Sequence, residues 1–346
     1  MSVFDHEAFD GHEHVSFFAE PSVGLRAIIA IHRTGPLGMA GGGCRMWPYR
    51  DERAALADAL RLSRAMTYKL ALLEMPAGGA KAVVIGDSKT DKSEALLLAL
   101  GRAVERLGGR FVIAEDVGTS ARDLEVVARA TSWVNRAAAD AGDTAGATAY
   151  GVVAAMRAAV KRRLGRADLD GLRVAVQGLG HVGGALCREL ARAGAQLVVA
   201  DVDAGAVSAI ARELGARAVA PEEIFDQPAD VFAPCALADA LDDGTVPRLR
   251  CAVIAGSANN QLAHPRIADA LAARDILWAP DIVANAGGVI ASASRGGDER
   301  VLRARLDGIG ALVEAVFARA ERERISTHEA AERTARERLA GAGGRP

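Results

Sequence analysis

The hexapeptide GLGHVG constrains the fold of this chain more than any other stretch. Gly178, Gly180 and Gly183 stand in GxGxxG spacing, after the apolar run LRVAVQ and before the helix-like segment VGGALCRELARAG. The next apolar run, QLVVADV, brings in Asp201 at about the 20-residue distance at which an acidic residue completes this motif. A strand, a glycine turn, a helix and an acidic strand end together predict a Rossmann-type dinucleotide site.

The chemistry of this turn suits a dinucleotide. Glycines allow close approach of the backbone to a pyrophosphate, and the N-terminus of the following helix offers its positive end. His181 and Val182, inside the turn, are expected to line the cofactor. Asp201 would accept hydrogen bonds from ribose hydroxyls and repel a 2′-phosphate, which favours NAD over NADP. A glycine turn without a ligand is the alternative, and the flanking elements disfavour it.

The second half of the chain contains five short apolar runs separated by segments of crossover length: LRVAVQ, QLVVADV, DVFAPCA, CAVIAG and ILWAPDIV. Such a series predicts a parallel sheet with helices on both faces, and ligands bind these sheets beyond the carboxyl ends of the strands. The small and amide residues after the later runs are therefore predicted cofactor contacts: Cys235, Ala236, Ala258, Asn259, Asn260 and Asn285. Asparagine is also a common turn residue, so each amide taken alone has a structural alternative.

The first half alternates between strand-like and helical segments. HVSFFAE, LRAIIAIHRT, AVVIGD and RFVIAEDVG predict strands, and apolar spacing predicts helices in DERAALADALRLSRAMTYKLALL, DKSEALLLALGRAVERLGGR and SARDLEVVARA. The glycine-rich GPLGMAGGGCR is expected to form a loop, too flexible for either regular element. The polar segment NRAAADAGDTAGAT marks a domain boundary. We therefore expect an α/β fold with two domains, residues 1–146 and 147–314, followed by a charged helical tail.

Two lysines and a carboxylate stand at the ends of predicted elements in the first half. Lys69 ends a helix, Lys81 precedes the strand AVVIGD behind the small residues 78–80, and Asp116 follows a strand. A lysine beside another cation in a partly dry site has a depressed pKa and can act as a base near neutral pH. We expect this role for Lys81. Snorkelling surface lysines are the alternative, and at a helix C-terminus Lys69 would also suit the helix dipole.

Composition argues against several classes of protein. A formal net charge of −2 disfavours a nucleic-acid binder, and no apolar run reaches the roughly 18 residues of a membrane span. The cysteines lie far apart without CxxC spacing, so reduced thiols in a cytoplasm are expected. His12, Glu13 and His14 could suggest a metal site, but no third ligand accompanies them and none is predicted.

Several stretches resemble the leucine/phenylalanine/valine dehydrogenase branch of the glutamate dehydrogenase superfamily, in order over nearly the whole chain: GGGCRMWPY, AMTYK, MPAGGAKAVVIGD, AEDVGT, TAYGV, VAVQGLGHVGG, APCA, AGSANNQL and APDIVANAGGVI. The resemblance implies an N-terminal substrate domain, a C-terminal Rossmann domain that binds NAD, and a cleft that closes during turnover. It implies that helices from about residue 315 to 346 pack back on the N-terminal domain. It also implies a homo-oligomer, from dimer to octamer. The implied reaction converts an L-amino acid, NAD+ and water to a 2-oxo acid, ammonium and NADH.

The same resemblance assigns roles by motif. Lys69 would bind the substrate carboxylate, Lys81 would activate the water that attacks the imino carbon, and Asp116 would shuttle protons to and from the amino nitrogen. Asn260 would contact both the substrate and the nicotinamide. Small residues of the first domain would lie against the substrate: Gly42, Gly43 and Ala114.

The predicted side-chain pocket departs from the usual leucine-enzyme pattern at two positions. Gly41 stands where a leucine is usual, and near Val289 on the other wall Ser292 replaces a valine. Both changes enlarge the pocket, so we expect a large apolar L-amino acid of the leucine or phenylalanine type. No cation is evident for a γ-carboxylate, so glutamate is not expected.

Two other functions are alternatives. An NAD-dependent 2-hydroxy-acid dehydrogenase would normally need a histidine base with a carboxylate partner. A catalytically silent NAD-binding regulatory protein would have no need to keep Lys69, Lys81 and Asp116 together.

Overall fold

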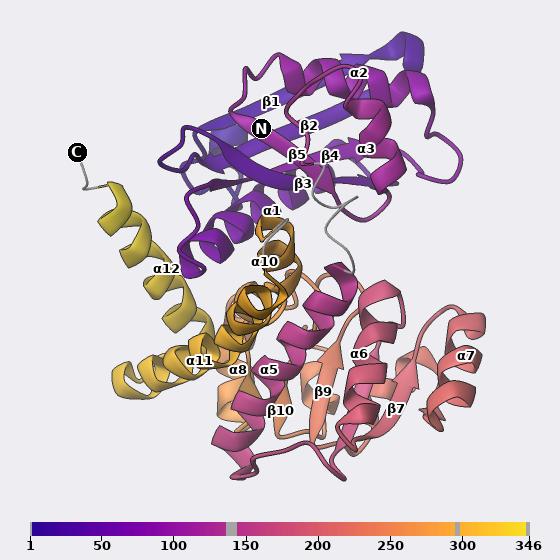
Figure 1. Cartoon of the computed structure of the whole chain (residues 1–346), viewed down its shortest axis with the longest axis vertical. Helices are drawn as coiled ribbons and strands as arrows, with labels where there is room; N and C mark the ends of the chain where they lie inside the picture. The colour runs from indigo at the N-terminus through magenta and orange to yellow at the C-terminus, as the bar shows by residue number, and fades with distance from the viewer. Residues whose placement is uncertain (1, 136–143, 295–297, 344–346) are drawn as a thin grey trace. The chain divides into compact units, whose positions relative to one another are not determined.

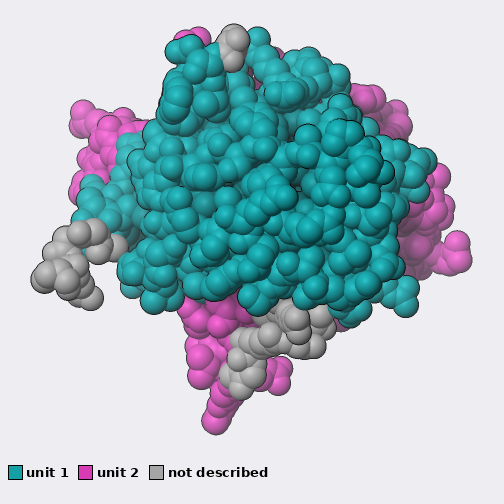
Figure 2. Space-filling model, turned by 90° about the horizontal axis from the view of Figure 1, so that it is seen from above, with its two compact units in different colours: residues 1–142, 335–346 teal, residues 143–334 magenta. Residues whose placement is uncertain are grey.

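The computed structural model describes residues 2–135, 144–294 and 298–343 of the chain. These residues form two compact units, which Figure 2 shows in different colours. Unit 1 consists of residues 1–142 and 335–346, and unit 2 consists of residues 143–334. Part of the predicted domain-boundary segment, residues 136–143, lies outside the described residues. The domain limits at 146/147 and at about 315 stay predictions.

Unit 1 is built on a five-stranded mixed sheet with the order β1-β2-β4-β3-β5 (Figure 1). Its strands are β1 (His14–Glu20), β2 (Leu25–Arg33), β3 (Ala40–Trp47), β4 (Gly78–Ile85) and β5 (Phe111–Glu115). The pairs β1/β2 and β2/β4 are antiparallel, whereas β3 pairs in parallel with both β4 and β5. The four strands predicted in this half are therefore present, and β3 is an additional central strand.

The prediction that GPLGMAGGGCR forms a loop is wrong, because its second half is β3. Glycine is permissive in isolation, which is why sequence reasoning assigned flexibility to it. Here the neighbouring strands leave no room for anything larger at one position: a Cβ atom on Gly42 would lie 1.8 Å from the carbonyl oxygen of Ala80 in β4. Close approach of two backbones is one of the reasons for glycine inside a strand.

The helices of unit 1 cover the two faces of the sheet. They are α1 (Glu52–Leu72), α2 (Glu94–Glu105) and α3 (Ala121–Val127). Along β2 the burial alternates: Ile28 and Ala30 pack with Leu60 of α1, whereas Ile29 and Ile31 pack with Leu96 of α2. Both faces of the central strands are therefore buried, which explains the near-continuous apolar run in LRAIIAIHRT.

Local sequence signals set the ends of these helices. The Asp51 carboxylate accepts a hydrogen bond of 2.7 Å from the Ala54 amide at the start of α1. Ser120 and Asp123 form a reciprocal capping box at the start of α3. Gly108 and Gly109 follow α2 with φ values of 57° and 85°, a left-handed conformation that stops the helix.

Unit 2 contains a six-stranded parallel sheet with the order β11-β10-β9-β6-β7-β8. Its strands are β6 (Arg173–Gln177), β7 (Gln196–Ala200), β8 (Arg217–Ala218), β9 (Val231–Pro234), β10 (Val253–Ile254) and β11 (Leu277–Trp278). The five predicted runs each contain a strand, and the two-residue β8 was missed because it has no apolar run. The parallel sheet with helical crossovers confirms the predicted α/β class.

The helices of unit 2 surround this sheet, with α5 packed beside α6 (Figure 1). They are α5 (Thr144–Leu164), α6 (His181–Arg192), α7 (Ala204–Leu214), α8 (Arg266–Ala273), α9 (Asp281–Ala284), α10 (Gly287–Ala293) and α11 (Glu299–Glu323). The predicted helical tail is two helices, because Arg324 adopts a left-handed φ of 54° between α11 and α12 (Thr327–Gly343). Short 3₁₀ turns are η1 (Val3–Asp5), η2 (Pro21–Val23), η3 (Pro221–Asp226) and η4 (Val246–Arg248).

Candidate active site and cofactor site

Lys81 lies inside β4, not in front of it as predicted. It pairs across the sheet with Ala30 of β2, and Ala30 belongs to the cluster on the α1 face. Cross-strand partners point to the same face of a sheet, so the Lys81 side chain leaves the sheet on the α1 side. Lys81 is 7% exposed, and an ammonium group this buried requires an ionic partner.

That partner is Asp116, directly after β5. The Lys81 Nζ atom lies 2.8 Å from Asp116 Oδ2, and Arg45 Nε donates to the same oxygen over 2.9 Å. Burial by itself raises the pKa of the Asp116 carboxyl, but the charges of Lys81 and then Arg45 outweigh burial and bring this pKa down to about 2. In this arrangement Asp116 is a carboxylate held between two cations.

Arg45 extends this network to a second carboxylate and was missed by sequence reasoning. Its Nη1 atom donates to Asp58 Oδ2 over 3.0 Å, and the Tyr49 hydroxyl donates to the same oxygen over 2.5 Å. Burial raises the Tyr49 pKa, and the neighbouring Asp58 charge raises it further, so the hydroxyl keeps its proton. The signal was present in GGGCR, because two-residue alternation along a strand places Arg45 on the same face as Gly41 and Gly43.

The glycines of β3 have different surroundings. A Cβ atom on Gly43 would lie 2.8 Å from Asp116 Cβ and 3.3 Å from Lys81 Nζ, so glycine is what lets this ion pair form beside the strand. Gly43 also pairs with Ala114 of β5, another small residue. A Cβ atom on Gly41 would meet no heavy atom within 4 Å, whereas Gly42 points into the packed β4 backbone. Open space therefore adjoins Gly41, and not Gly42.

The small residues before Lys81 serve close packing and do not line open space. A Cβ atom on Gly79 would lie 2.0 Å from the Thr67 amide nitrogen of α1, and one on Gly78 would lie 1.9 Å from the Arg33 carbonyl oxygen. These glycines let α1 and the end of β2 approach β4. Lys69, two residues after Thr67, lies in the last turn of α1 and is 8% exposed.

The glycine turn of unit 2 has the geometry expected of a dinucleotide turn. Gly178 has φ of 95°, and a Cβ atom on it would lie 2.6 Å from the Ala236 amide nitrogen. A Cβ atom on Gly183 would lie 2.0 Å from the Gly178 carbonyl oxygen, so this glycine packs α6 against the turn. Gly180, by contrast, faces open space. The Asp201 carboxylate at the end of β7 accepts a 2.5 Å hydrogen bond from the Leu179 amide and one of 2.8 Å from the Asp203 amide.

Three predicted asparagines lie around the loop that follows β10. Asn285 Nδ2 donates to Asn259 Oδ1 over 2.8 Å and to the Ser257 carbonyl oxygen over 3.1 Å. Gln261 braces the loop from within, since its Nε2 atom donates to Gly256 and Ala258 carbonyl oxygens. Within the described residues, Asn260 Nδ2 and Asn285 Oδ1 are buried without a hydrogen-bond partner. One donor and one acceptor are thus left for a ligand.

The other predicted contacts lie at the edges of these elements. His181 begins α6 and is exposed, and Val182 follows it half-buried. Cys235 donates its amide to the Gln177 carbonyl oxygen over 2.7 Å, and burial raises the pKa of its thiol. Val289 and Ser292 are half-buried, one helical turn apart on α10, so they belong to unit 2 whereas Gly41 belongs to unit 1.

The histidines around the start of β1 form hydrogen bonds within unit 1. His12 is buried, and its Nε2 atom lies 3.1 Å from the Leu60 carbonyl oxygen and 3.0 Å from Ser63 Oγ. His14 Nε2 hydrogen-bonds Ser16 Oγ instead. Among the described residues, no group of three or more His, Cys, Asp or Glu side chains is placed to hold a metal ion. In the same ranges no helix is long and apolar enough to cross a membrane.

Comparisons with known proteins match both halves of the chain to one family. The family model described as "Glu/Leu/Phe/Val dehydrogenase, dimerisation domain" matches residues 12–133. The model "Glutamate/Leucine/Phenylalanine/Valine dehydrogenase" matches residues 141–209 and 202–343. Together they confirm the resemblance drawn from the motifs.

Individual relatives span nearly the full length. The chain is 44% identical to a leucine dehydrogenase of Geobacillus stearothermophilus, over 98% of this chain and 94% of the relative. It is 45% identical to a valine dehydrogenase of Streptomyces virginiae, over 97% and 96% respectively. The crystal structure of L-tryptophan dehydrogenase from Nostoc punctiforme is similar with a TM-score of 0.77 and 41% identity, over 96% of this chain and 97% of that one.

Proposed function

The chain belongs to the Glu/Leu/Phe/Val dehydrogenase family, and on that premise we propose that it is an NAD-dependent dehydrogenase of apolar L-amino acids. The reaction is the reversible oxidative deamination of an L-amino acid with water to a 2-oxo acid and ammonium. The full-length relatives that act on leucine, valine and tryptophan support this reaction class. The observation that carries it within the molecule is the buried Lys81–Asp116 pair on the face of the sheet where Gly41 adjoins open space.

The residues of unit 2 fit a nicotinamide dinucleotide. Gly180 faces open space at the N-terminus of α6, where a pyrophosphate would approach the backbone. The unpartnered Asn260 Nδ2 and Asn285 Oδ1 atoms match the acceptor and the donor of a carboxamide. When bound, the nicotinamide would take the hydride from the substrate α-carbon. The Asp201 carboxylate supports NAD over NADP, because it would repel a 2′-phosphate.

Within this reaction the protonation state of Lys81 controls how readily Asp116 accepts a proton. Of the two cations that keep Asp116 ionised, Lys81 has the larger effect. When Lys81 gives up its proton, Asp116 loses that support and becomes a better proton acceptor. The pair can therefore take a proton from the substrate ammonium at one step and deprotonate the attacking water at another. Arg45, which keeps a charge throughout, holds Asp116 in place as a positioning residue.

The remaining roles are those that the family motifs assign. Lys69 binds the substrate carboxylate, at the end of the helix that packs on β4. Gly41, Gly43 and Ala114 line the substrate on the open face of β3 and β5. Val289 and Ser292 of α10 border the substrate side chain.

The Lys81→Ala variant tests the catalytic role. It should abolish ammonium-dependent oxidation of NADH by a 2-oxo acid, whereas NADH binding, measured by fluorescence titration, stays intact. Lys92→Ala is the matched control, because Lys92 forms the same kind of pair with Asp123 at 2.8 Å in unit 1 and has no predicted catalytic role. Unchanged turnover in Lys81→Ala would contradict the assignment. NADH oxidation that proceeds without ammonium would instead indicate a 2-hydroxy-acid dehydrogenase.

The substrate is proposed to carry a large apolar side chain, leucine or phenylalanine in type. The open space beside Gly41 supports this choice, since a leucine at that position would occupy it. A comparison of kcat/KM for leucine, valine, phenylalanine and tryptophan, each with NAD+ and with NADP+, tests both preferences. A clear preference for valine would reject the enlarged pocket, and a preference for NADP+ would reject the role of Asp201.

The protein is further proposed to be a homo-oligomer. The family model that matches residues 12–133 is described as a dimerisation domain, which supports assembly through unit 1. Light scattering coupled to size-exclusion chromatography should give a mass that is at least twice the 35.9 kDa of one chain. A monomeric mass at micromolar concentration would reject this proposal.

A further inference from the structure

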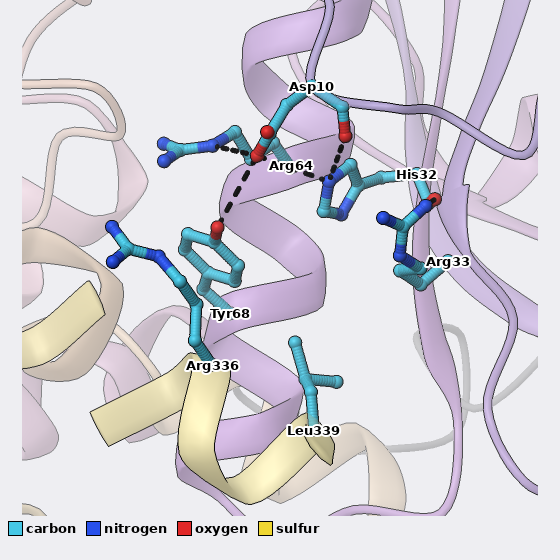
Figure 3. A pocket seen from close by; sticks show the side chains of 7 residues that line it. All are labelled: Asp10, His32, Arg33, Arg64, Tyr68, Arg336 and Leu339. Carbon is cyan, nitrogen blue, oxygen red and sulfur yellow. Dashed lines mark hydrogen bonds and ion pairs between the residues drawn. The ribbon is translucent and has the colours of Figure 1, made fainter. Parts of the chain in front are cut away.

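One pocket of unit 1 is lined by residues other than Lys69, Lys81 and Asp116. It encloses about 400 Å³, within the range of small-molecule sites. Figure 3 shows the side chains that line it: Asp10, His32, Arg33, Arg64, Tyr68, Arg336 and Leu339. They come from the segment before β1, from the end of β2, from α1 and from α12, so residues more than 300 positions apart in the sequence meet here.

Positive charge dominates the lining. The lining contains three guanidinium groups, those of Arg33, Arg64 and Arg336, and one carboxylate, that of Asp10. The carboxylate is held in place: Arg64 Nε donates to Asp10 Oδ2 over 2.7 Å, and the Tyr68 hydroxyl lies 3.4 Å from the same atom. Desolvation raises the Asp10 pKa, but the contacts with Arg64, His32 and Tyr68 together outweigh it and lower this pKa, so the group stays ionised. The lining side chains therefore carry a net positive charge of about two at neutral pH.

Two of the aromatic rings that line the pocket are buried. His32 is 2% exposed and Tyr68 is 4% exposed, and their rings meet edge to face with centroids 5.9 Å apart. Burial, together with the charges of His12 and Arg33, lowers the pKa of His32 to about 4, so this ring is neutral at physiological pH. The Arg64 guanidinium lies 4.6 Å from the centre of the Tyr68 ring, which fixes its orientation.

We propose that this pocket binds a small dianion, recognised by the guanidinium groups of Arg33, Arg64 and Arg336. Guanidinium groups present planar pairs of donors that match the oxygens of phosphate and carboxylate groups. Arg33 is oriented by its own donation to the carbonyl oxygens of Gly11 and His32 (3.1 Å to the latter). The Leu339 side chain and the Tyr68 ring leave part of the wall apolar, which accommodates the carbon skeleton of an organic anion as well as a free phosphate.

A bound dianion would join the C-terminal segment of the chain to α1. Arg336 and Leu339 belong to α12, and Arg338 of the same helix already donates to the Leu72 carbonyl oxygen and pairs with Glu74 at 3.3 Å. The ligand would add a second connection between α12 and α1, at Tyr68, one turn of α1 before Leu72. Tyr68 is the neighbour of Lys69, so occupancy of this pocket would also stiffen the end of α1.

Calorimetric titration of the full chain distinguishes the two sources of such an anion. Inorganic phosphate and succinate are titrated separately at constant ionic strength, with chloride as the reference, because screening weakens all exposed charge interactions. Saturable binding of phosphate alone assigns the site to phosphate groups, and saturable binding of succinate alone assigns it to dicarboxylates. If neither anion binds more tightly than chloride, the proposal is rejected.

A variant places the binding in this pocket. Arg336→Gln should weaken the binding by about tenfold or more, as expected for loss of one charge-assisted contact. Arg333→Gln is the matched control, since Arg333 lies on the same helix, pairs with Glu329 at 2.7 Å and does not line the pocket. Equal affinity of Arg336→Gln and the original protein would overturn the proposal. Thermal melting of both variants without ligand verifies that each is folded.

Discussion

Asp116 illustrates how three neighbouring residues set the properties of one carboxyl group. Lys81 and Arg45 both contact its Oδ2 atom, and Gly43 leaves the space in which they meet. The pKa of Asp116 is about 2 in the folded chain, below the ordinary aspartate value of 3.8, so the folded state favours the carboxylate. The contacts that keep this group ionised therefore also stabilise the fold at neutral pH.

The lowered pKa of Asp116 predicts that this residue makes the free energy of unfolding depend on pH. A carboxyl group whose pKa is lowered by folding stabilises the folded state at pH values above its unfolded-state pKa. This contribution is lost as the pH falls towards its folded-state pKa. Asp116 should contribute about 2 kcal/mol to the free energy of unfolding at neutral pH, roughly half of which is lost by pH 3. Urea denaturation at a series of pH values should show this loss in the original protein and not in Asp116→Asn. Parallel curves for the two proteins would contradict the prediction.

Two glycines in one strand should respond differently to the same added methyl group. Gly43→Ala pushes a Cβ atom against Asp116 Cβ, which displaces the Lys81–Asp116 pair, so kcat/KM should fall by about 100-fold or more. Gly41→Ala adds its methyl group to open space, so the activity should persist, with the largest substrates losing the most. Steady-state kinetics on leucine and phenylalanine would test both, and similar losses in the two variants would refute the distinction.

At the scale of elements, glycine determines how closely strands and helices approach. Gly79 admits the backbone of α1 to β4, Gly42 admits β4 to β3, and Gly183 admits α6 to the glycine turn. In each case the added Cβ atom would meet backbone, which cannot move as a side chain can. These close approaches explain why the stretches that contain these residues, GGGCR, GGAK and GLGHVG, are rich in glycine.

Helix α11 offers a test of glycine where no such approach exists. A Cβ atom on Gly308 would meet nothing within 4 Å, so Gly308→Ala should stabilise the chain by about 0.5–1 kcal/mol through helix propensity. On the same helix a Cβ atom on Gly310 would lie 3.1 Å from the Ala154 carbonyl oxygen of α5, so Gly310→Ala should gain less or lose stability. Chemical denaturation would measure both, and a larger gain from Gly310→Ala would contradict this account.

At the scale of the whole molecule, the chain forms unit 1, then unit 2, and then contributes its last residues to unit 1 again. The returning segment, residues 335–346, includes Arg338, which donates to the Leu72 carbonyl oxygen at the end of α1, and the buried Ala335. The end of α1 also carries Lys69, so the last part of the chain supports the helix that presents a predicted substrate ligand.

Truncation tests this support. Removal of residues 335–346 should lower the free energy of unfolding of unit 1 by roughly 1–3 kcal/mol, because the Arg338 hydrogen bond is lost. KM for the amino acid should rise as the end of α1 loosens. Hydrogen exchange of the α1 amides would locate the effect, and unaltered protection of α1 in the truncated protein would disprove it.

The sequence by itself determined the elements whose signals are local. The strand, turn and helix around Gly178, the parallel sheet that follows, and the family membership all came from residues close together in the chain, since strand propensity, turn chemistry and motif spacing act over short distances. The tertiary structure alone decided that GGGCR is a strand and that Arg45 joins Asp116. It alone brought Arg33, Arg64 and Arg336 around one pocket. These features depend on pairing register and on contacts between distant segments, and a glycine's own preferences do not reveal which backbone will lie against it.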